Sequence, residues 1–311
     1  MEKKFISFVI YLHNDAERAG HFFKTVMPVI DSYFGQYELI CVDDESTDNT
    51  AELVRDFARG SGHGNVISLI HMGFYQGMEA SMNAGRDISI GDFVYEFDDL
   101  TADYDPSILI KAFETLLTGY DIVSVSGNRP KKLTSRLFYS LFNRTSRGNG
   151  KIGSETFRIL SRRAINRVKS MGRYIPYRKA VYANCGLKTT ALNYEPLSGV
   201  KGESVRPADS SMRTALAFDS FIYFTSFLEK FSLTVSVIFL AISLFMGVYI
   251  ITDYFKVQKP VEGWMSTMGF LSIGFFGVFA LLTIILKYLS VLLNLIFRQQ
   301  RYLVSDVEKL N

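Results

Sequence analysis

The stretch YELICVDDESTDNTAELVRDFARG, residues 37–60, contains a complete strand-to-helix transition. An apolar run ends in two aspartates, and a polar Ser-Thr-Asp-Asn-Thr segment that can cap a helix leads into an amphipathic pattern. Short apolar runs separated by amphipathic segments recur through the first half of the chain, at residues 5–12, 65–71, 92–97 and 120–127. Near-continuous apolar strands alternating with helices predict an α/β fold with a mostly parallel sheet covered on both faces.

Acidic side chains follow two of the predicted strands. Asp43 and Asp44 end the second strand, and Glu96, Asp98 and Asp99 end the fourth. Loops are commonly acidic because they face water, but ligands of such sheets also gather at the carboxyl ends of the strands. The sequence therefore predicts a ligand site at this edge of the sheet.

The C-terminal third contains two long stretches without charge. Phe231 to Thr252 and Gly263 to Leu286 each span roughly 30 to 36 Å as a helix, enough to cross a bilayer. Two buried helices of a soluble core are the alternative, although such helices seldom lack a polar face over this length. We expect two transmembrane helices, in which small residues would let helices pack closely, as in a homo-oligomer: Gly247, Gly269, Gly274 and Gly277.

The flanking residues predict the orientation of these spans. The N-terminus has only a short apolar run, so we expect neither a signal peptide nor a span there. Lys287, Arg298 and Arg301 follow the second stretch, which favours a cytoplasmic C-terminus. Two cysteines, Cys41 and Cys185, indicate no disulfide framework. We therefore expect a multi-pass protein of the plasma (inner) membrane with a cytoplasmic catalytic domain.

The net charge of +3 is unevenly distributed. Residues 129–179 carry fifteen Lys or Arg and a single acid, Glu155. Within them, residues 133–144 (LTSRLFYSLFNR) form a basic amphipathic pattern, which suggests contact with anionic membrane lipids. Nucleic acid is the competing partner for a basic stretch, but we expect none because the chain also carries predicted membrane helices.

These patterns predict four regions. We expect a cytoplasmic catalytic domain over residues 1–200, an interfacial amphipathic segment over 201–229, two transmembrane helices within 230–298, and a cytoplasmic tail over 299–311.

Four segments, taken in order, resemble one enzyme family. FISFVIYLHNDAE (5–17), ELICVDDESTDNTAEL (38–53), GFYQGMEASMNAG (73–85) and GDFVYEFDDL (91–100) have the order and approximate spacing of motifs in the GT-A family 2 glycosyltransferases. The paired C-terminal stretches resemble the polyprenyl-phosphate sugar transferases, the subgroup of dolichyl-phosphate mannose synthase and the bactoprenol glucosyltransferases. The resemblance implies a Rossmann-like GT-A catalytic domain followed by two membrane helices.

The resemblance also implies a nucleotide-binding set. The first motif would cradle the base, Asp43 or Asp44 would accept hydrogen bonds from the base or ribose, and the glycine segment would lie beside the donor. The residues so implied are Tyr11, Asn14, Asp15, Asp43, Asp44, Gly73 and Gly77. Asp15 could instead cap the following helix. Tyr11 and His13 stand where the family usually has Pro and Tyr, and Glu45 where it has Gly.

A divalent metal is expected near the fourth strand. In the family an Asp-x-Asp motif holds a cation that neutralises the sugar-diphosphate leaving group. Here the frame anchored on Leu100 places Phe97 and Asp99 at the two Asp positions, while Glu96-Phe97-Asp98 and Asp103-Tyr104-Asp105 offer other acid-x-acid frames. We expect Asp98 and Asp99 to be the catalytic ligands of Mg²⁺ or Mn²⁺.

Basic side chains would receive the phosphates. GSETFRILSRR (153–163), YIPYRK (174–179) and VKGES (200–204) fall where the family places phosphate-proximal arginines, although Thr156 replaces an acid. The resemblance makes Arg158, Arg178 and Lys201 candidates for the donor diphosphate or the acceptor phosphate, and the bidentate arginine fork suits that task.

The resemblance thus implies an inverting, metal-assisted transfer of a sugar from a nucleotide diphosphate sugar to polyprenyl (undecaprenyl) phosphate. An anionic phosphate acceptor needs no general base, whereas a hydroxyl acceptor does. Two alternatives remain open. One is a family 2 enzyme acting on a glycan or glycolipid hydroxyl, and the other is a catalytically weakened subunit that binds a nucleotide sugar.

Overall fold

The computed structural model describes residues 2–60, 66–129, 139–140, 142–144, 152–171, 177–197, 263–297 and 302–310, with single positions between 231 and 245. The chain divides into two compact units, one formed by Met1–Ser220 with Arg298–Asn311 and the other by Phe221–Phe297. The predicted sites fall in the first unit. Lys201 and most of residues 133–144, 201–229 and 231–252 lie outside the described residues.

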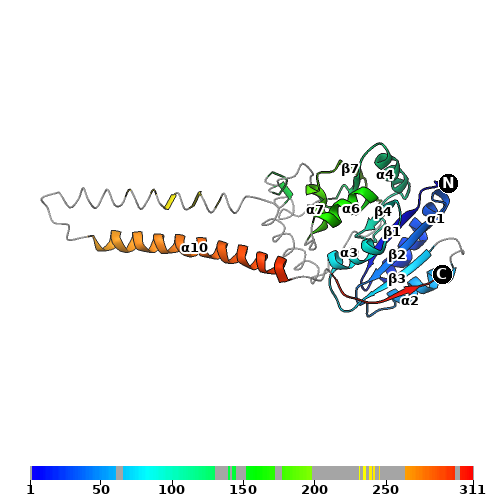
Figure 1. Ribbon diagram of the computed structural model, residues 1–311, viewed down its shortest axis with the longest axis horizontal. Coiled ribbons are helices and arrows are strands. Elements are labelled where there is room, and N and C mark those ends of the chain that lie inside the picture. Colours follow the sequence, from blue (N-terminus) through cyan, green and yellow to red (C-terminus); the bar gives the residue numbers. More distant parts are fainter. Residues whose placement is uncertain are drawn as a thin grey trace. The chain divides into compact units, whose positions relative to one another are not determined.

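Helices and strands alternate along the first unit (Figure 1). The strands are β1 (Ile6–Leu12), β2 (Tyr37–Asp43), β3 (Val66–Met72), β4 (Phe93–Phe97), β5 (Ile122–Gly127), β6 (Phe157–Ser161), β7 (Thr189–Tyr194) and β8 (Val304–Lys309). The helices are α1 (Ala16–Tyr33), α2 (Thr50–Gly60), α3 (Met78–Ile88), α4 (Ser107–Leu117), α6 (Arg162–Ser170) and α7 (Arg178–Asn184). The second unit contains α10 (Trp264–Phe297).

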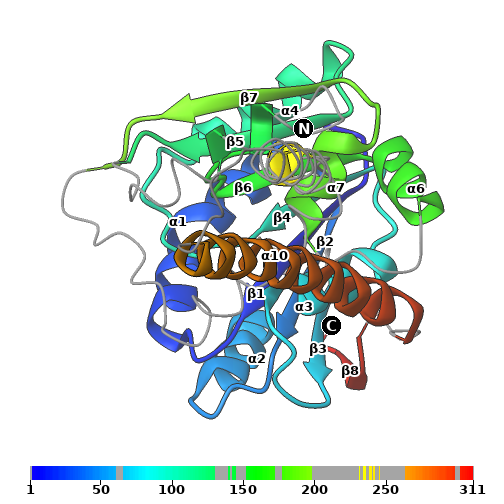
Figure 2. The same ribbon diagram turned by 90° about the vertical axis from the view of Figure 1, so that its left-hand side faces the viewer.

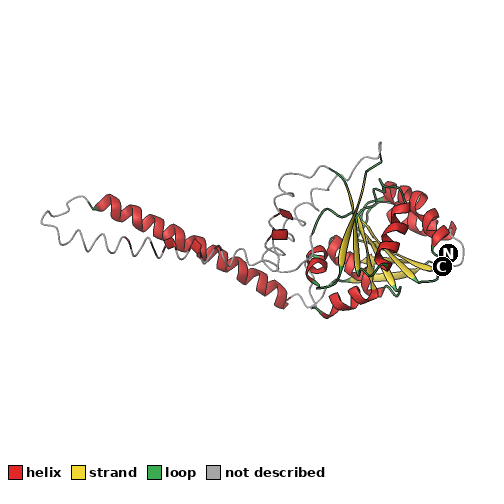
Figure 3. Ribbon diagram, turned by 90° about the horizontal axis from the view of Figure 1, so that it is seen from above, coloured by secondary structure: helices red, strands yellow, loops and turns green. Residues whose placement is uncertain are grey.

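The described strands form one sheet in the order β7-β5-β6-β4-β1-β2-β3-β8, with β7 and β8 at opposite edges (Figure 2). Strands β1 to β5 and β7 run in one direction, and β6 and β8 run against their neighbours. Helices lie on both sides of the twisted sheet (Figure 3). The prediction of a mostly parallel α/β sheet is confirmed.

The two faces of β4 have different environments because successive strand residues point to opposite sides. Tyr95 and Phe97 enter an apolar core with α1, α2 and α4, in which the Phe97 and Phe22 rings lie 5.0 Å apart. Glu96 points to the other face, where α3 and α7 supply polar partners. One strand therefore contributes to both the aromatic core and a charged layer.

Close packing of α3 on the sheet depends on Gly85. A Cβ atom at this position would lie 2.4 Å from a Val9 methyl carbon and 2.8 Å from one of Val42. Real Cβ atoms are not found this close to other carbons, so a larger residue would push the helix off the strands. Because α3 begins directly after the loop at residues 73–77, this contact also fixes where that loop meets the sheet.

The C-terminal segment departs from the sequence-based expectation. Residues 299–311 were expected to form a tail, whereas Val304–Lys309 forms strand β8, antiparallel to β3. In the short run VSDVEK five positions are exposed and the sixth, Glu308, is charged, so the run resembles a polar tail and the pattern alone did not indicate a strand. Its backbone pairing with β3 extends the sheet by one strand.

Within the part of the chain that the structure describes, no helix meets the length and hydropathy that crossing a bilayer requires.

Candidate active site at the carboxyl ends of the strands

Asp44 anchors the loop between β3 and α3. Its two carboxylate oxygens accept hydrogen bonds from the backbone N–H of Gln76, at 2.8 Å, and of Gly77, at 2.7 Å. The Tyr11 hydroxyl donates a third hydrogen bond at 3.2 Å. Burial raises the pKa of Asp44, although these hydrogen bonds oppose the rise. Tyr11, Asp44 and Gly77, all predicted to bind nucleotide, are thus brought together.

Gly77 owes its place to its backbone conformation. Its φ of 83° lies in the left-handed region, where only glycine is unstrained, and this turn aims its N–H at Asp44. Gly73, at the other end of the loop, donates its N–H to the carbonyl of Leu303 at 3.0 Å. Both predicted glycines therefore shape the loop through backbone contacts.

Asp43 lies beside Asp44 but contacts different groups. Its carboxylate accepts hydrogen bonds from the Ser46 N–H, at 3.2 Å, and from His71 Nδ1, at 3.3 Å. Burial acts to raise the pKa of Asp43, but the hydrogen bonds from His71 and Ser46 outweigh it and lower the pKa. Asp43 is therefore held ionised at the end of β2.

Asn14 and Asp15 connect two neighbouring loops. Asn14, at a φ of 50°, accepts hydrogen bonds from the backbone N–H groups of Thr47, at 2.7 Å, and Asp48, at 3.3 Å. The N–H of Asp15 donates to the Thr50 hydroxyl at 2.8 Å. These contacts join the loop after β1 to the loop after β2. The structure therefore gives both residues a local structural task, and their nucleotide contact stays a prediction.

An aromatic pair that sequence reasoning did not assign lies at the same edge. The rings of His13 and Tyr75 are 4.6 Å apart, and His13 Nδ1 lies 2.5 Å from the carbonyl oxygen of Asp44. Both side chains are half-buried, so each retains surface for a planar ligand. The available signal was the position of His13, where related motifs have another ring, tyrosine.

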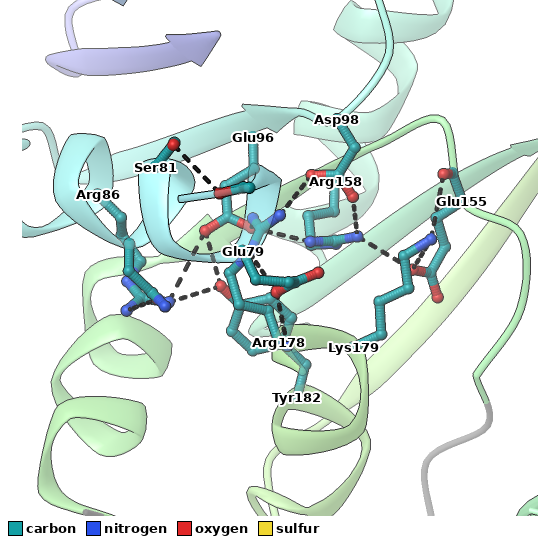
Figure 4. A network of polar contacts seen from close by, with 12 residues as sticks. Glu79, Ser81, Arg86, Glu96, Asp98, Glu155, Arg158, Arg178, Lys179 and Tyr182 are labelled. Carbon is teal, nitrogen blue, oxygen red and sulfur yellow. Dashed lines mark hydrogen bonds and ion pairs between the residues drawn. The ribbon is translucent and has the colours of Figure 1, made fainter. Parts of the chain in front are cut away.

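Asp98 lies in a buried network of ion pairs below the end of β4 (Figure 4). Its carboxylate accepts hydrogen bonds from Arg158 Nη2, at 2.7 Å, and from Arg178 Nη2, at 2.8 Å. Burial acts to raise the pKa of Asp98, but the charges of Arg158 and Arg178 outweigh it and hold the pKa far below its ordinary value. Three predicted site residues, Asp98, Arg158 and Arg178, thus lie together, and these hydrogen bonds join them to one another.

Further side chains complete this buried network. Glu96 accepts hydrogen bonds from Arg158, at 2.9 Å, and from Arg178 and the Tyr182 hydroxyl, both at 2.7 Å. Arg178 also donates through Nε to Glu79 at 2.9 Å. The described members balance in charge, with four carboxylates and four cations: Glu79, Glu96, Asp98, Glu155, Arg86, Arg158, Arg178 and Lys179.

The network changes how the predicted phosphate-binding arginines are understood. Both Arg158 and Arg178 are fully buried, and carboxylates accept their guanidinium hydrogen bonds. A guanidinium whose charge is already compensated is poorly placed to attract a phosphate. Their contact with phosphate stays a prediction.

Asp99 has a different environment from Asp98. One of its oxygens accepts a hydrogen bond from the Thr101 N–H at 2.9 Å, and the other lies 3.7 Å from Arg129 Nη1. Asp105, further along the loop, accepts from the Ser107 N–H and thereby caps α4. Asp98, by contrast, accepts hydrogen bonds from two buried arginines.

The acidic end of β4 offers few ligands for a divalent cation. Among the described residues, no group of three or more His, Cys, Asp or Glu side chains could hold one. Mg²⁺ is commonly held by one or two carboxylates, with substrate phosphates and water filling the other positions. Asp99 fits that arrangement as a single ligand. Asp98 does not, because two arginines already bind its oxygens.

Asp103 and its neighbours form a third polar group. The Tyr194 hydroxyl donates to Asp103 at 2.8 Å, and Arg129 Nε donates at 3.0 Å. Burial, followed by hydrogen bonding to Asp103, raises the pKa of Tyr194. The literal Asp-x-Asp at residues 103–105 therefore consists of one carboxylate paired with Arg129 and one that caps a helix.

Several curated relatives are similar to this chain, two of them over most of their length. An uncharacterized glycosyltransferase of Synechocystis sp. is 24% identical over 97% of this chain and 95% of its own. A bactoprenol glucosyl transferase of Shigella phage SfX is 24% identical over 88% of each chain. An undecaprenyl-phosphate 4-deoxy-4-formamido-L-arabinose transferase of Edwardsiella ictaluri is 30% identical over 46% of this chain and 45% of its own.

A solved structure supports the fold. Mannosyl-3-phosphoglycerate synthase from Rubrobacter xylanophilus superposes with a TM-score of 0.51 at 16% identity, over 71% of this chain and 73% of its own. The family model described as glycosyl transferase family 2 matches residues 7–169, more than half of the chain and all of the strands from β2 to β6. The predicted GT-A fold and glycosyltransferase activity are confirmed, and the chain belongs to glycosyl transferase family 2.

Proposed function

We propose that this glycosyltransferase transfers a sugar from a nucleotide diphosphate sugar to a polyprenyl phosphate such as undecaprenyl phosphate. The observation that carries the proposal is the similarity to bactoprenol glucosyl transferases over 88% of both chains. The partial match to an undecaprenyl-phosphate transferase supports the same acceptor class.

The donor would occupy the carboxyl edge of the sheet. The half-buried His13 and Tyr75 rings can stack with a nucleobase, and the ionised Asp43 can accept hydrogen bonds from the base or ribose. The diphosphate would then lie toward Asp99, which follows strand β4 at the same edge of the sheet. Bound Mg²⁺ or Mn²⁺ would supply charge that stabilises the departing nucleoside diphosphate, with Asp99 as its protein ligand.

The acceptor phosphate needs little help from the protein to attack. It is an anion at neutral pH, so an oxygen can bond to the anomeric carbon while the bond to the nucleoside diphosphate breaks, with inversion at that carbon. No side chain has to remove a proton. The protein's task is to bring two anions together, which is the role predicted for the basic residues within 129–179 and for Lys201.

We further propose that the chain is anchored in the plasma membrane with its catalytic domain in the cytoplasm. The two uncharged stretches of the sequence support this proposal. Large apolar side chains are exposed along one stretch of α10, namely Ile273, Phe275, Phe276, Val278 and Phe279. A surface of this kind is unusual for a helix that contacts water, because it would aggregate.

The experiment combines membranes containing the full-length protein with radiolabelled nucleotide sugars and undecaprenyl phosphate, followed by organic extraction. We expect label in the lipid fraction for one donor, dependent on the added acceptor and a divalent metal. Asp99→Asn should lower the amount of product about a hundredfold or more, and Asp105→Asn, a change of the same type at a helix cap, should not. Transfer to a glycan or glycolipid hydroxyl with none to the polyprenyl phosphate would overturn the proposal.

A further inference from the structure

Four charged side chains, here called the edge chain, link the C-terminal strand to the end of β2. Arg55 on α2 donates two hydrogen bonds to Glu308 on β8, at 3.0 and 2.7 Å. Glu308 Oε1 lies 2.9 Å from His71 Nε2, and His71 Nδ1 lies 3.3 Å from Asp43 Oδ2. The edge chain therefore runs from α2 through β8 and β3 to a residue of the predicted nucleotide site.

The geometry determines the charge of His71. Each of its ring nitrogens faces a carboxylate oxygen, and an ionised carboxylate can only accept hydrogen bonds. Both nitrogens must therefore donate, which requires the imidazolium form. In agreement, the hydrogen bond to Asp43 raises the pKa of His71, with a further contribution from Glu308 and an opposing one from burial.

Glu308 is likewise held ionised. Its hydrogen bonds from Arg55 lower its pKa, burial opposes this, and the hydrogen bond from His71 lowers it further, to about 2. The charged groups around His71 come from three elements: Asp43 on β2, Glu308 and the exposed Asp306 on β8, and Arg55 with Glu52 on α2.

The same C-terminal segment holds the loop at residues 73–77. The Leu303 carbonyl accepts hydrogen bonds from the Gly73 N–H, at 3.0 Å, and from the Gln76 side chain, at 2.7 Å. The Leu303 N–H donates back to Gln76 at 2.8 Å. The Gln76 N–H in turn donates to Asp44. The C-terminal segment therefore reaches Asp44 through Gln76 and Asp43 through His71.

We propose that Glu308 is a positioning residue for the nucleotide donor. Acting through protonated His71, it fixes the carboxylate of Asp43 and thereby makes the strand after α10 necessary for full donor affinity. The inference deepens the donor half of the proposed function, since it rests on nucleotide contact by Asp43. It is independent of the acceptor and of membrane anchoring.

The sign of the pH effect follows from His71. Below the folded-state pKa of His71 both ring nitrogens donate to carboxylates and the edge chain is intact. As the pH rises through that pKa, His71 loses a proton and one ring nitrogen stops donating to its carboxylate. Nucleotide affinity should then fall. Removing the negative charge of Glu308 weakens the preference for imidazolium, so this alkaline loss should move to lower pH.

The experiment measures binding of UDP and GDP, each with Mn²⁺, to the full-length protein in detergent by calorimetry across neutral and alkaline pH. For Glu308→Gln we expect affinity roughly two- to tenfold weaker, from the net worth of one hydrogen bond, and an alkaline loss at lower pH. Asp306→Asn removes the same charge from the same strand and should bind like the wild type. His71→Gln cannot titrate and should show no alkaline loss.

Two results would overturn the positioning role. One is equal nucleotide affinity for Glu308→Gln and Asp306→Asn. The other is a Glu308→Gln variant whose affinity is lower by the same factor at every pH and whose melting temperature is also lower, which would mean that β8 had detached from the sheet. If the wild-type protein bound neither UDP nor GDP, the result would contradict the proposed donor site and, with it, the positioning role of Glu308. Nucleotide binding without transfer to polyprenyl phosphate would contradict only the proposed acceptor.

Discussion

The buried network and the edge chain are both made of paired charges, yet they differ in composition and exposure. The buried network joins carboxylates to arginines in the interior, and arginine does not lose its proton at any ordinary pH. The edge chain includes a partly exposed histidine between two carboxylates. The first cluster is therefore suited to hold a fixed geometry, whereas the second can respond to pH and to a ligand.

The largest expected effect is a loss of stability when the buried network is broken. Arg178→Met removes the cation shared by Glu79, Glu96 and Asp98, so the buried network keeps Arg158 beside Glu96 and Asp98 but has one carboxylate charge in excess. We expect the free energy of unfolding to fall by about 3 to 5 kcal/mol, measured by denaturant titration of the full-length protein in detergent.

The matched control is Arg59→Met. Arg59 forms an exposed ion pair with Asp56 on the same helix, at 2.8 Å, and exposed pairs of this kind contribute little. An Arg178 variant as stable as the Arg59 variant would show that the network does not hold the fold, and would return Arg178 to the role of phosphate ligand.

The second effect separates the two predicted metal ligands. Asp99→Asn should lower the transfer rate about a hundredfold or more, because the cation that stabilises the leaving group loses its protein ligand, while the melting temperature stays close to that of the wild type. Asp98→Asn should instead lower the melting temperature, because Asp98 belongs to the buried network. Activity and thermal unfolding of both variants would be measured side by side, and an Asp98 variant of normal stability but without activity would contradict this division.

Much of this fold follows from the sequence because its signals are local. Apolar runs such as residues 37–42 and the polar segment before α2 predict strand, turn and helix without knowledge of partners. Strand β8 was not predicted, because an edge strand pairs on one side only and needs no alternation of apolar and polar residues. Its place beside β3 depends on a partner more than 200 residues earlier in the chain.

The candidate site was less predictable because burial of charge is a property of the assembled fold. Asp43 and Asp44 were located correctly at the end of β2, since strand ends can be read from the pattern. Arg158 and Arg178 looked like surface cations within the basic residues 129–179, and nothing local shows that they meet Glu96 and Asp98 at the end of another strand. The decisive hint was Glu96, a carboxylate at an inward position of an otherwise apolar strand.

The third prediction contrasts the two clusters by pH. Asp98 has a lowered pKa, so its contribution to stability is complete above its unfolded pKa of about 4 and is lost as pH falls toward the folded value. His71 has a raised pKa, so its contribution is complete below its unfolded pKa of about 6.5 and is lost as pH rises through the folded value. Unfolding of wild type, Asp98→Asn and His71→Gln over a pH series should show opposite trends; parallel curves would contradict the contrast.

The smallest effect should come from Gln76→Ala. This change removes the two side-chain hydrogen bonds to Leu303 but keeps the backbone N–H that binds Asp44, so the loop at residues 73–77 loses its tie to the C-terminal segment alone. We expect the KM for the nucleotide sugar to rise roughly two- to fivefold with little change in kcat, because a looser loop must be ordered when the donor binds. Ser305→Ala, which removes one exposed hydrogen bond from the same segment to the His71 carbonyl, serves as the comparison. A fall in kcat with unchanged KM would place the loop in the transfer step, and would mean that the edge of the sheet acts on the transition state as well as on binding.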